Sequence, residues 1–192
     1  MAYYGLKKPI VAKRTAAGTY DIPQGGLVQF ARAIAFSVAP TFAEAALACD
    51  DDPHGEYEKE FVEADVTLGT DTVPVDVNEV LFGATASASA SGTGAEVNVV
   101  TYKKDDQANE VGTAVIGDEV LHGVKKWVAV FLPRVKYADP GENFETKGSA
   151  ITYKTPSITG KAYAEADGTW RKRAVFGSEA EAVGWIEACF GV

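Results

Sequence analysis

The sequence has few of the residues that build disulfide, metal or nucleophilic sites. Its 192 residues include only two cysteines, Cys49 and Cys189, and two histidines, His54 and His122. Two cysteines so far apart exclude a disulfide framework and a CxxC motif, and we expect both to be reduced and buried. Both histidines lie in polar, turn-like sequence. The chain therefore has few histidines with which to build a histidine-rich metal site or a Ser-His-Asp triad.

Long hydrophobic runs are also missing. The longest, residues 127–132, has six residues, whereas a membrane helix needs about 20. The basic residues near the N-terminus are not followed by an apolar stretch, so we expect neither a membrane helix nor a signal peptide.

No sequence motif of catalysis is present. The chain contains no GxGxxG, GxxxxGK[ST] or GxSxG pattern, which leaves phosphate binding by a glycine loop and a nucleophile elbow without support. Nothing singles out two of the 27 acids as a glycosidase pair. The three tryptophans, Trp127, Trp170 and Trp185, fall inside expected elements and suit core packing. We therefore expect no enzyme and no cofactor.

What is present is an ordinary globular composition with an acidic excess. Hydrophobic residues make up 46% and charged residues 23% of the chain, which fits one folded domain over residues 1–192. The net charge is −9, with 18 basic and 27 acidic residues. A domain that grips nucleic acid by neutralising phosphates would show the opposite balance.

The charge is unevenly distributed along the chain. The first fourteen residues carry four bases and no acid, whereas residues 42–79 carry twelve acids and one base. One interpretation is a solvated acidic loop and a flexible basic tail. The other is a head-to-tail contact, in which the basic arm of one subunit meets the acidic loop of the next and generates rings or filaments. The candidate inter-subunit residues are Lys7, Lys8, Lys13, Arg14, Asp50, Asp51, Asp52, Glu56, Glu58 and Glu60.

A calcium site is the other hypothesis for the acidic loop. Asp50, Asp51, Asp52 and Glu56 are hard oxygen ligands that suit Ca²⁺. The EF-hand pattern is absent, and the run DDDPHG is typical of a turn. We favour a solvated turn and expect no metal.

Alternating apolar residues predict a mainly β (α+β) fold, a β-sandwich or barrel. Strands are expected over residues 27–38 (closed by Pro40), 42–49, 60–68, 96–102, 125–132, 144–153, 157–164 and 170–176, with 96–102 beside 125–132 and a hairpin turn at Asp167-Gly168. An N-terminal arm (about 1–20) and long loops (about 50–60, 84–94 and 103–124) are expected outside these strands.

Two helices complete the expected fold. Asp76 and Glu79 have capping-box spacing before a short apolar helix that Gly83 would end. Ser178 and Glu181 form a second capping box. The stripe that follows it, Ala182, Trp185, Ile186, Cys189 and Phe190, recurs at helical spacing and should pack on the sheet.

Several segments, in a fixed order, resemble the major tail proteins, or tail tube proteins, of long-tailed bacteriophages. They are KWVAVFLPRVKY (126–137), TKGSAITYKTPSITG (146–160), DGTW (167–170) and SEAEA (178–182) followed by Trp185 and Ile186. Upstream, an alternating strand, an alanine-rich strand ending in Cys49-Asp50-Asp51, and VLFG (80–83) look like the same family. Residues 84–94 and 105–123 match nothing we can align.

The resemblance implies a β-sandwich or barrel flanked by a helix, with six copies forming a ring and rings stacking into a tube. Its partners would be copies of itself and other tail proteins. Genomic DNA would pass through the lumen unbound, and the location would be the tail of the virion, assembled in the host cytoplasm. The alternatives are a related ring-forming tail or secretion-tube component, or a β-sandwich module that binds a cell surface or carbohydrate. The last would gather Tyr3, Tyr4, Tyr57 and Tyr163 on one face.

Overall fold

The chain consists mainly of antiparallel strands. A computed structural model describes residues 2–23, 26–49, 52–90, 96–143, 146 and 155–192, and within these ranges it contains eleven strands and two helices. This confirms the predicted mainly β (α+β) fold with a short internal helix and a C-terminal helix.

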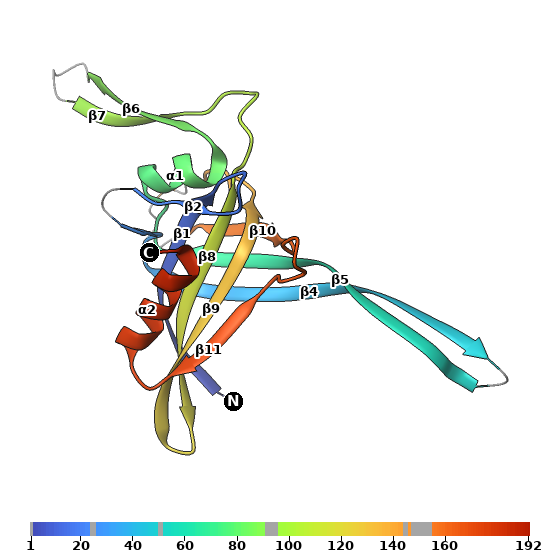
Figure 1. Cartoon of the computed structure of the whole chain (residues 1–192). Helices are drawn as coiled ribbons and strands as arrows, with labels where there is room; N and C mark the ends of the chain where they lie inside the picture. The colour runs from blue at the N-terminus through green and yellow to red at the C-terminus, as the bar shows by residue number, and fades with distance from the viewer. Residues whose placement is uncertain (1, 24–25, 50–51, 91–95, 144–145, 147–154) are drawn as a thin grey trace.

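Nine strands form one sheet (Figure 1). Its main path runs in the order β2-β1-β8-β9-β10-β5-β4, while β3 pairs with β1 and β11 pairs with β9. The bounds are β1 Ala2–Arg14, β2 Tyr20–Asp21, β3 Val28–Gln29, β4 Ala33–Cys49, β5 Asp52–Thr70, β8 Glu110–Leu121, β9 Val124–Tyr137, β10 Ser157–Ala162 and β11 Lys172–Phe176.

The sheet divides at β9, because two strands share one of its edges. There β11 pairs with Trp127 through Phe131, and β10 pairs with Val135 through Tyr137. The part of the sheet formed by β10, β5 and β4 crosses the part formed by β1, β8 and β9 (Figure 1). The main core includes buried residues from both parts: Val11, Ala64, Val66, Leu68, Val111, Leu132, Val135, Tyr137, Ile158 and Ala162.

Helix α2 (Glu179–Phe190) builds a second core on β1, β8 and β9. Its Ala182, Ile186 and Phe190 recur every four residues and pack against residues that include Ile116 and Phe131. At its start, Ser178 Oγ accepts from Glu181 N (3.3 Å), and Glu181 Oε2 accepts from Ser178 N (3.2 Å). The predicted capping box and the packing of this helix on the sheet are confirmed.

Helix α1 (Val75–Phe82) ends as predicted but begins differently. Gly83 follows it with φ 70°, the left-handed conformation that glycine adopts without strain. The predicted capping box at Asp76 is wrong, because Pro74 is the N-cap and makes no side-chain bond. Asp76 lies inside the first turn, where a carboxylate still favours the positive end of the helix dipole.

The expected N-terminal arm is an integral strand of the sheet. Residues 2–14 form β1, which pairs with β8 from Ala2 to Lys13. The interpretation as an arm was wrong because the apolar residues Ile10, Val11 and Ala12 are buried in the two cores, and that burial holds the strand in place.

The expected loop over residues 103–124 was also wrong, since 110–121 is β8, a central strand. Residues 111–116 are all buried. A strand covered on both faces lacks the alternation that marks a half-buried strand. Its glycines and the two buried acidic residues, Asp118 and Glu119, also made its strand character hard to recognise in the sequence.

The loop expected at 84–94 is wrong for residues 85–90, which pair through their backbone, and residues 91–94 lie outside the described residues. Strands β6 (Thr85–Ala90) and β7 (Glu96–Thr101) form a separate two-stranded sheet. The strand expected at 96–102 is therefore confirmed, but its expected pairing with 125–132 is wrong, because β9 pairs with β8 on that edge.

Strand β4 passes through Pro40, so the two strands expected on either side of this residue are one. Proline lacks an N–H, and β4 tolerates it as an edge strand of the sheet. The loop expected at 50–60 is wrong as well, because β5 begins at Asp52 and runs antiparallel to β4. Asp50 and Asp51 lie outside the described residues.

The segment after β9 is partly confirmed. The turn at Asp167-Gly168 is present, with Glu165 N donating to Thr169 O (2.9 Å). The expected hairpin around it is wrong, because β10 and β11 pair with different stretches of β9 rather than with each other. The strand expected at 144–153 falls, apart from residue 146, outside the described residues.

Candidate assembly surface

Most of the basic residues of β1 form ion pairs with acidic residues of the same chain. Lys7 Nζ donates to Glu179 Oε2 (3.1 Å) and lies 3.4 Å from Asp118 Oδ2, and Lys8 Nζ lies 3.3 Å from Glu179 Oε1. The hydrogen bond from Lys7 lowers the pKa of Glu179. Since Glu179 is the first residue of α2, both lysines tie β1 to the start of that helix.

Arg14 is committed in the same way. Only 15% of its side chain is exposed, Nε donates to Glu165 Oε1 (2.8 Å), and Nη1 lies 3.7 Å from Glu110 Oε2. Lys13 is exposed, and no ion pair joins it to another described residue. Of the four basic candidates, therefore, only Lys13 is available to a neighbouring molecule without breaking an existing pair.

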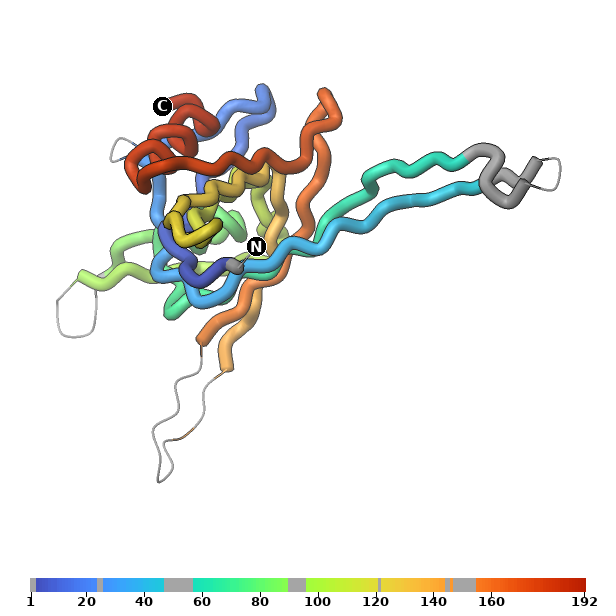
Figure 2. The backbone as a smooth tube through the Cα atoms, turned by 90° about the horizontal axis from the view of Figure 1, so that it is seen from below, coloured from blue at the N-terminus to red at the C-terminus, as the bar shows by residue number. Residues whose placement is uncertain are grey.

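The acidic candidates that the structure describes belong to a hairpin that projects from the rest of the molecule. Strands β4 and β5 continue well beyond the point where they cross the sheet, as Figures 1 and 2 show from two directions. Asp52 and Glu56 lie on β5, and only their backbone is described. Glu58 and Glu60 are exposed, and neither forms an ion pair with another described residue.

The two faces of the hairpin differ in chemistry. Strand register places Phe42 opposite Phe61, Glu44 opposite Lys59 and Ala46 opposite Tyr57 on one face. Lys59 bridges this face, because its Nζ donates to Glu44 Oε1 (2.5 Å) and lies 4.4 Å from the centre of the Phe42 ring. Side chains of successive residues point to opposite faces.

The other face carries two rows. Ala43 lies opposite Glu60 and Ala45 opposite Glu58, so β4 contributes small apolar side chains and β5 contributes carboxylates. We call these four residues the alanine–glutamate face. The exposed glutamates have no described cation beside them, so the negative charge of this face is uncompensated within the described chain.

An aromatic stack holds the root of the hairpin. The Phe42 ring lies edge-on to Phe61, Phe61 stacks on Trp170 with centroids 4.5 Å apart, and Arg171 lies 4.5 Å from the centre of the Trp170 ring. The stack joins the hairpin to the connection between β10 and β11. The expected core packing of Trp170 is confirmed, because this residue packs against the main core, but its stacking on Phe61 was not predicted from the sequence. The sequence signal that could have indicated this aromatic contact is the presence of an aromatic residue at both position 42 and position 61.

Arg171 also lines an open cleft of about 640 Å³ between the two parts of the sheet. Its walls include Leu6, Phe36 and Val130, which are apolar, and Arg173 stands beside them. Arg173 donates to the Tyr3 hydroxyl (3.0 Å) and lies 3.6 Å from the buried Glu119 carboxylate.

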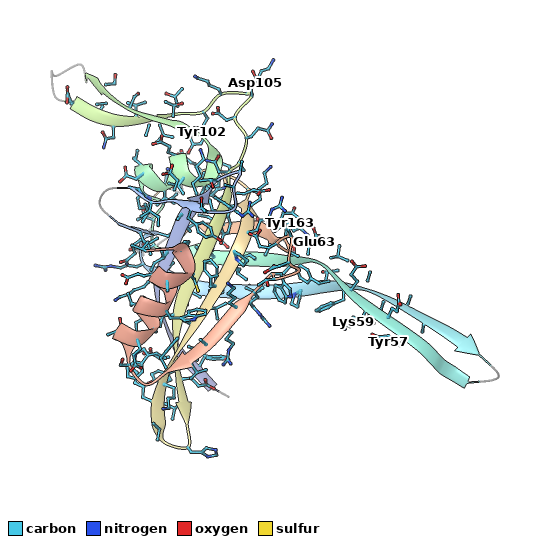
Figure 3. All side chains as sticks on the ribbon, in the orientation of Figure 1. Tyr57, Lys59, Glu63, Tyr102, Asp105 and Tyr163 are labelled. Carbon is cyan, nitrogen blue, oxygen red and sulfur yellow. The ribbon has the colours of Figure 1, made fainter. Side chains whose placement is uncertain are left out.

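The tyrosines that a carbohydrate-binding module would gather are dispersed. Tyr57 lies on the projecting hairpin, whereas Tyr163 lies near the end of β10 (Figure 3). Tyr3 and Tyr4 are each 57% exposed and line the cleft on β1. The four side chains therefore form no single platform.

Within the residues that the structure describes, no group of three or more His, Cys, Asp and Glu side chains is arranged to hold a metal ion. Neither helix found there has the length and apolar character required to span a membrane.

No protein-family model and no curated protein sequence matches this chain.

Proposed function

We propose that this chain is the structural subunit of a bacteriophage tail tube, which assembles into stacked, six-membered rings whose channel conducts DNA. The observation that carries the proposal is the β4–β5 hairpin, which extends away from the remainder of the fold (Figure 2). The segments 126–137, 146–160, 167–170 and 178–182, whose sequences and order along the chain resemble those of tail tube proteins, support it independently.

The hairpin has the properties of a segment that is completed by neighbouring molecules. A two-stranded ribbon is marginally stable in water without a further strand or layer. Beyond β10, which pairs with Ala64 through Gly69, β5 has only β4 beside it. Phe42 and Tyr57 remain exposed along this stretch. Burial of such side chains against other copies would supply the missing stabilisation.

A contact of this kind joins two different surfaces. The hairpin of one copy must meet the body of the next, which is a heterologous contact that generates either a closed ring or an open filament. A stack of rings combines both arrangements. The net charge of −9 is consistent with a channel for DNA, because a surface of like charge does not bind phosphates.

Size-exclusion chromatography with light scattering, followed by negative-stain microscopy of the same fractions, tests the proposal. We expect rings or tubes with a central hole. Replacing residues 44–59 by an Asn-Gly turn should give a folded monomer, because the aromatic stack at Phe42 and Phe61 is retained. Circular dichroism and thermal unfolding would verify its fold. A full-length chain that stays monomeric at every concentration and salt would contradict the proposal and favour a binding module.

A further inference from the structure

We infer that the alanine–glutamate face of one copy's hairpin docks in the cleft of a second copy, with Glu58 and Glu60 opposite Arg171 and Arg173. This inference rests on the proposed function and extends it by identifying the surface that receives the hairpin. The occupant of the cleft is thus a second copy of this chain.

The charges of the two surfaces are complementary in sign and in spacing. Glu58 and Glu60 are two residues apart on β5, and at about 3.3 Å per residue they lie roughly 7 Å apart along the strand. Arg171 immediately precedes β11 and Arg173 is the second residue of that strand, so the two arginines are also two residues apart. Two carboxylates can therefore meet two guanidinium groups in register, and each contact is a charge-assisted hydrogen bond.

The apolar parts of the two surfaces also correspond. Ala43 and Ala45 lie beside the glutamate row, and Leu6, Phe36 and Val130 lie beside the arginines in the cleft. Alanine side chains are small, so the ribbon can approach the cleft wall closely. An apolar row against an apolar wall excludes water, which strengthens the neighbouring ion pairs.

Glu58, Glu60 and Arg171 form no ion pair within the described chain, whereas Arg173 already contacts Tyr3 and Glu119 and would share its guanidinium with the incoming carboxylate. Arg171 stacks on Trp170, which stacks on Phe61, so the arginine lies on the phenylalanine face of its own hairpin. Glu58 and Glu60 point from the opposite face, and no ion pair joins them to Arg171 in the described structure. The glutamates must therefore reach the arginines of another copy, and repetition of that contact is heterologous.

Charge reversal followed by charge exchange tests the contact. Arg171→Glu and Glu60→Arg should each raise the protein concentration needed for half-maximal assembly by roughly tenfold or more. The combined variant should restore assembly, because the pair is re-formed with exchanged charges. Lys104→Glu, at an exposed turn between β7 and β8, makes the same change of charge as Arg171→Glu away from the cleft and should assemble as the wild type does. Light scattering measures assembly, and thermal unfolding checks that each variant is folded.

The outcomes separate this contact from the proposed function. A wild-type chain that forms tubes, with an Arg171→Glu variant that assembles equally well, would overturn the contact and leave the tube proposal intact. Loss of assembly that the combined variant does not restore would also overturn the pairing. A wild-type chain that remains monomeric would overturn both.

Discussion

The indole of Trp170 lies flat on the phenyl ring of Phe61, with ring centroids 4.5 Å apart and planes inclined by 7°. The two residues are far apart in the sequence, and their contact ties the root of the β4–β5 hairpin to the connection between β10 and β11. The hairpin is therefore attached to the body by side chains as well as by its backbone.

Removing the indole should weaken both the fold and the direction of the hairpin. We expect Trp170→Ala to lower the free energy of unfolding by about 2 kcal/mol, because a partly buried stacked ring is lost. Trp170→Phe keeps a ring against Phe61 and should cost about half as much. Urea unfolding of both variants measures the difference. Equal costs for the two would show that a phenyl ring at position 170 recovers no stability, and would contradict a stabilising contact with Phe61.

Gly112 on β8 marks a close approach between the sheet and the elements packed on it. A Cβ there would lie 2.5 Å from a Tyr20 ring carbon and 2.8 Å from a Phe190 ring carbon. Gly112→Ala should therefore destabilise the protein by about 2 kcal/mol through overpacking. Gly184→Ala, in α2, meets nothing within 4 Å and should stabilise it by about 0.5 kcal/mol. Thermal unfolding of the two variants measures these effects. A Gly112→Ala variant as stable as the wild type would contradict this account.

The two helix starts offer a matched test of capping. Ser178→Ala removes the acceptor for Glu181 N and should cost about 1 kcal/mol. Asp76→Ala at α1 removes no cap bond, so its effect should stay within about 0.5 kcal/mol. Denaturant unfolding distinguishes the two. Similar losses at both sites would mean that Asp76 caps α1 in solution.

Glu110 should contribute to acid sensitivity. The hydrogen bond from Arg134 holds the pKa of Glu110 below its ordinary value of 4.5. A carboxyl whose pKa is lowered by folding stabilises the protein at neutral pH, and this stabilisation is lost as the pH falls through the pKa of the folded state. Because the pair is partly exposed, we expect about 0.5 kcal/mol.

The matching experiment compares unfolding of Glu110→Gln with the wild type from neutral pH downward. The variant should be less stable at pH 7 and should lose less stability on acidification. Glu187→Gln, at an exposed position on α2, serves as the control and should follow the wild type. A wild-type advantage that persists unchanged to acid pH would exclude the ion pair as its source.

Local signals in the sequence were sufficient for part of the fold. The capping box at Ser178, the apolar stripe through Phe190 and the terminating Gly83 act within a few residues, so they could be recognised without knowledge of any partner. The run of acids around Glu58 was equally visible, and it identified the segment that projects from the molecule.

Other features depended on partners remote in sequence. The strand character of β8 is concealed, because burial on both faces removes the alternation, and β1 is ordered by pairing with it. Likewise, the commitment of Lys7 and Arg14 to Glu179 and Glu165 could not be read from their positions in a basic segment.

By itself, then, the sequence determined a mainly β fold, a capped C-terminal helix and an acidic excess around Glu58, because propensity, capping and charge are local properties of the chain. The tertiary structure alone decided which charges remain available. It pairs Lys7, Lys8 and Arg14 within the molecule and places Glu58 and Glu60 on the face of the hairpin opposite Trp170. Long-range strand pairing brings these residues to their positions, and no local pattern encodes which strands meet.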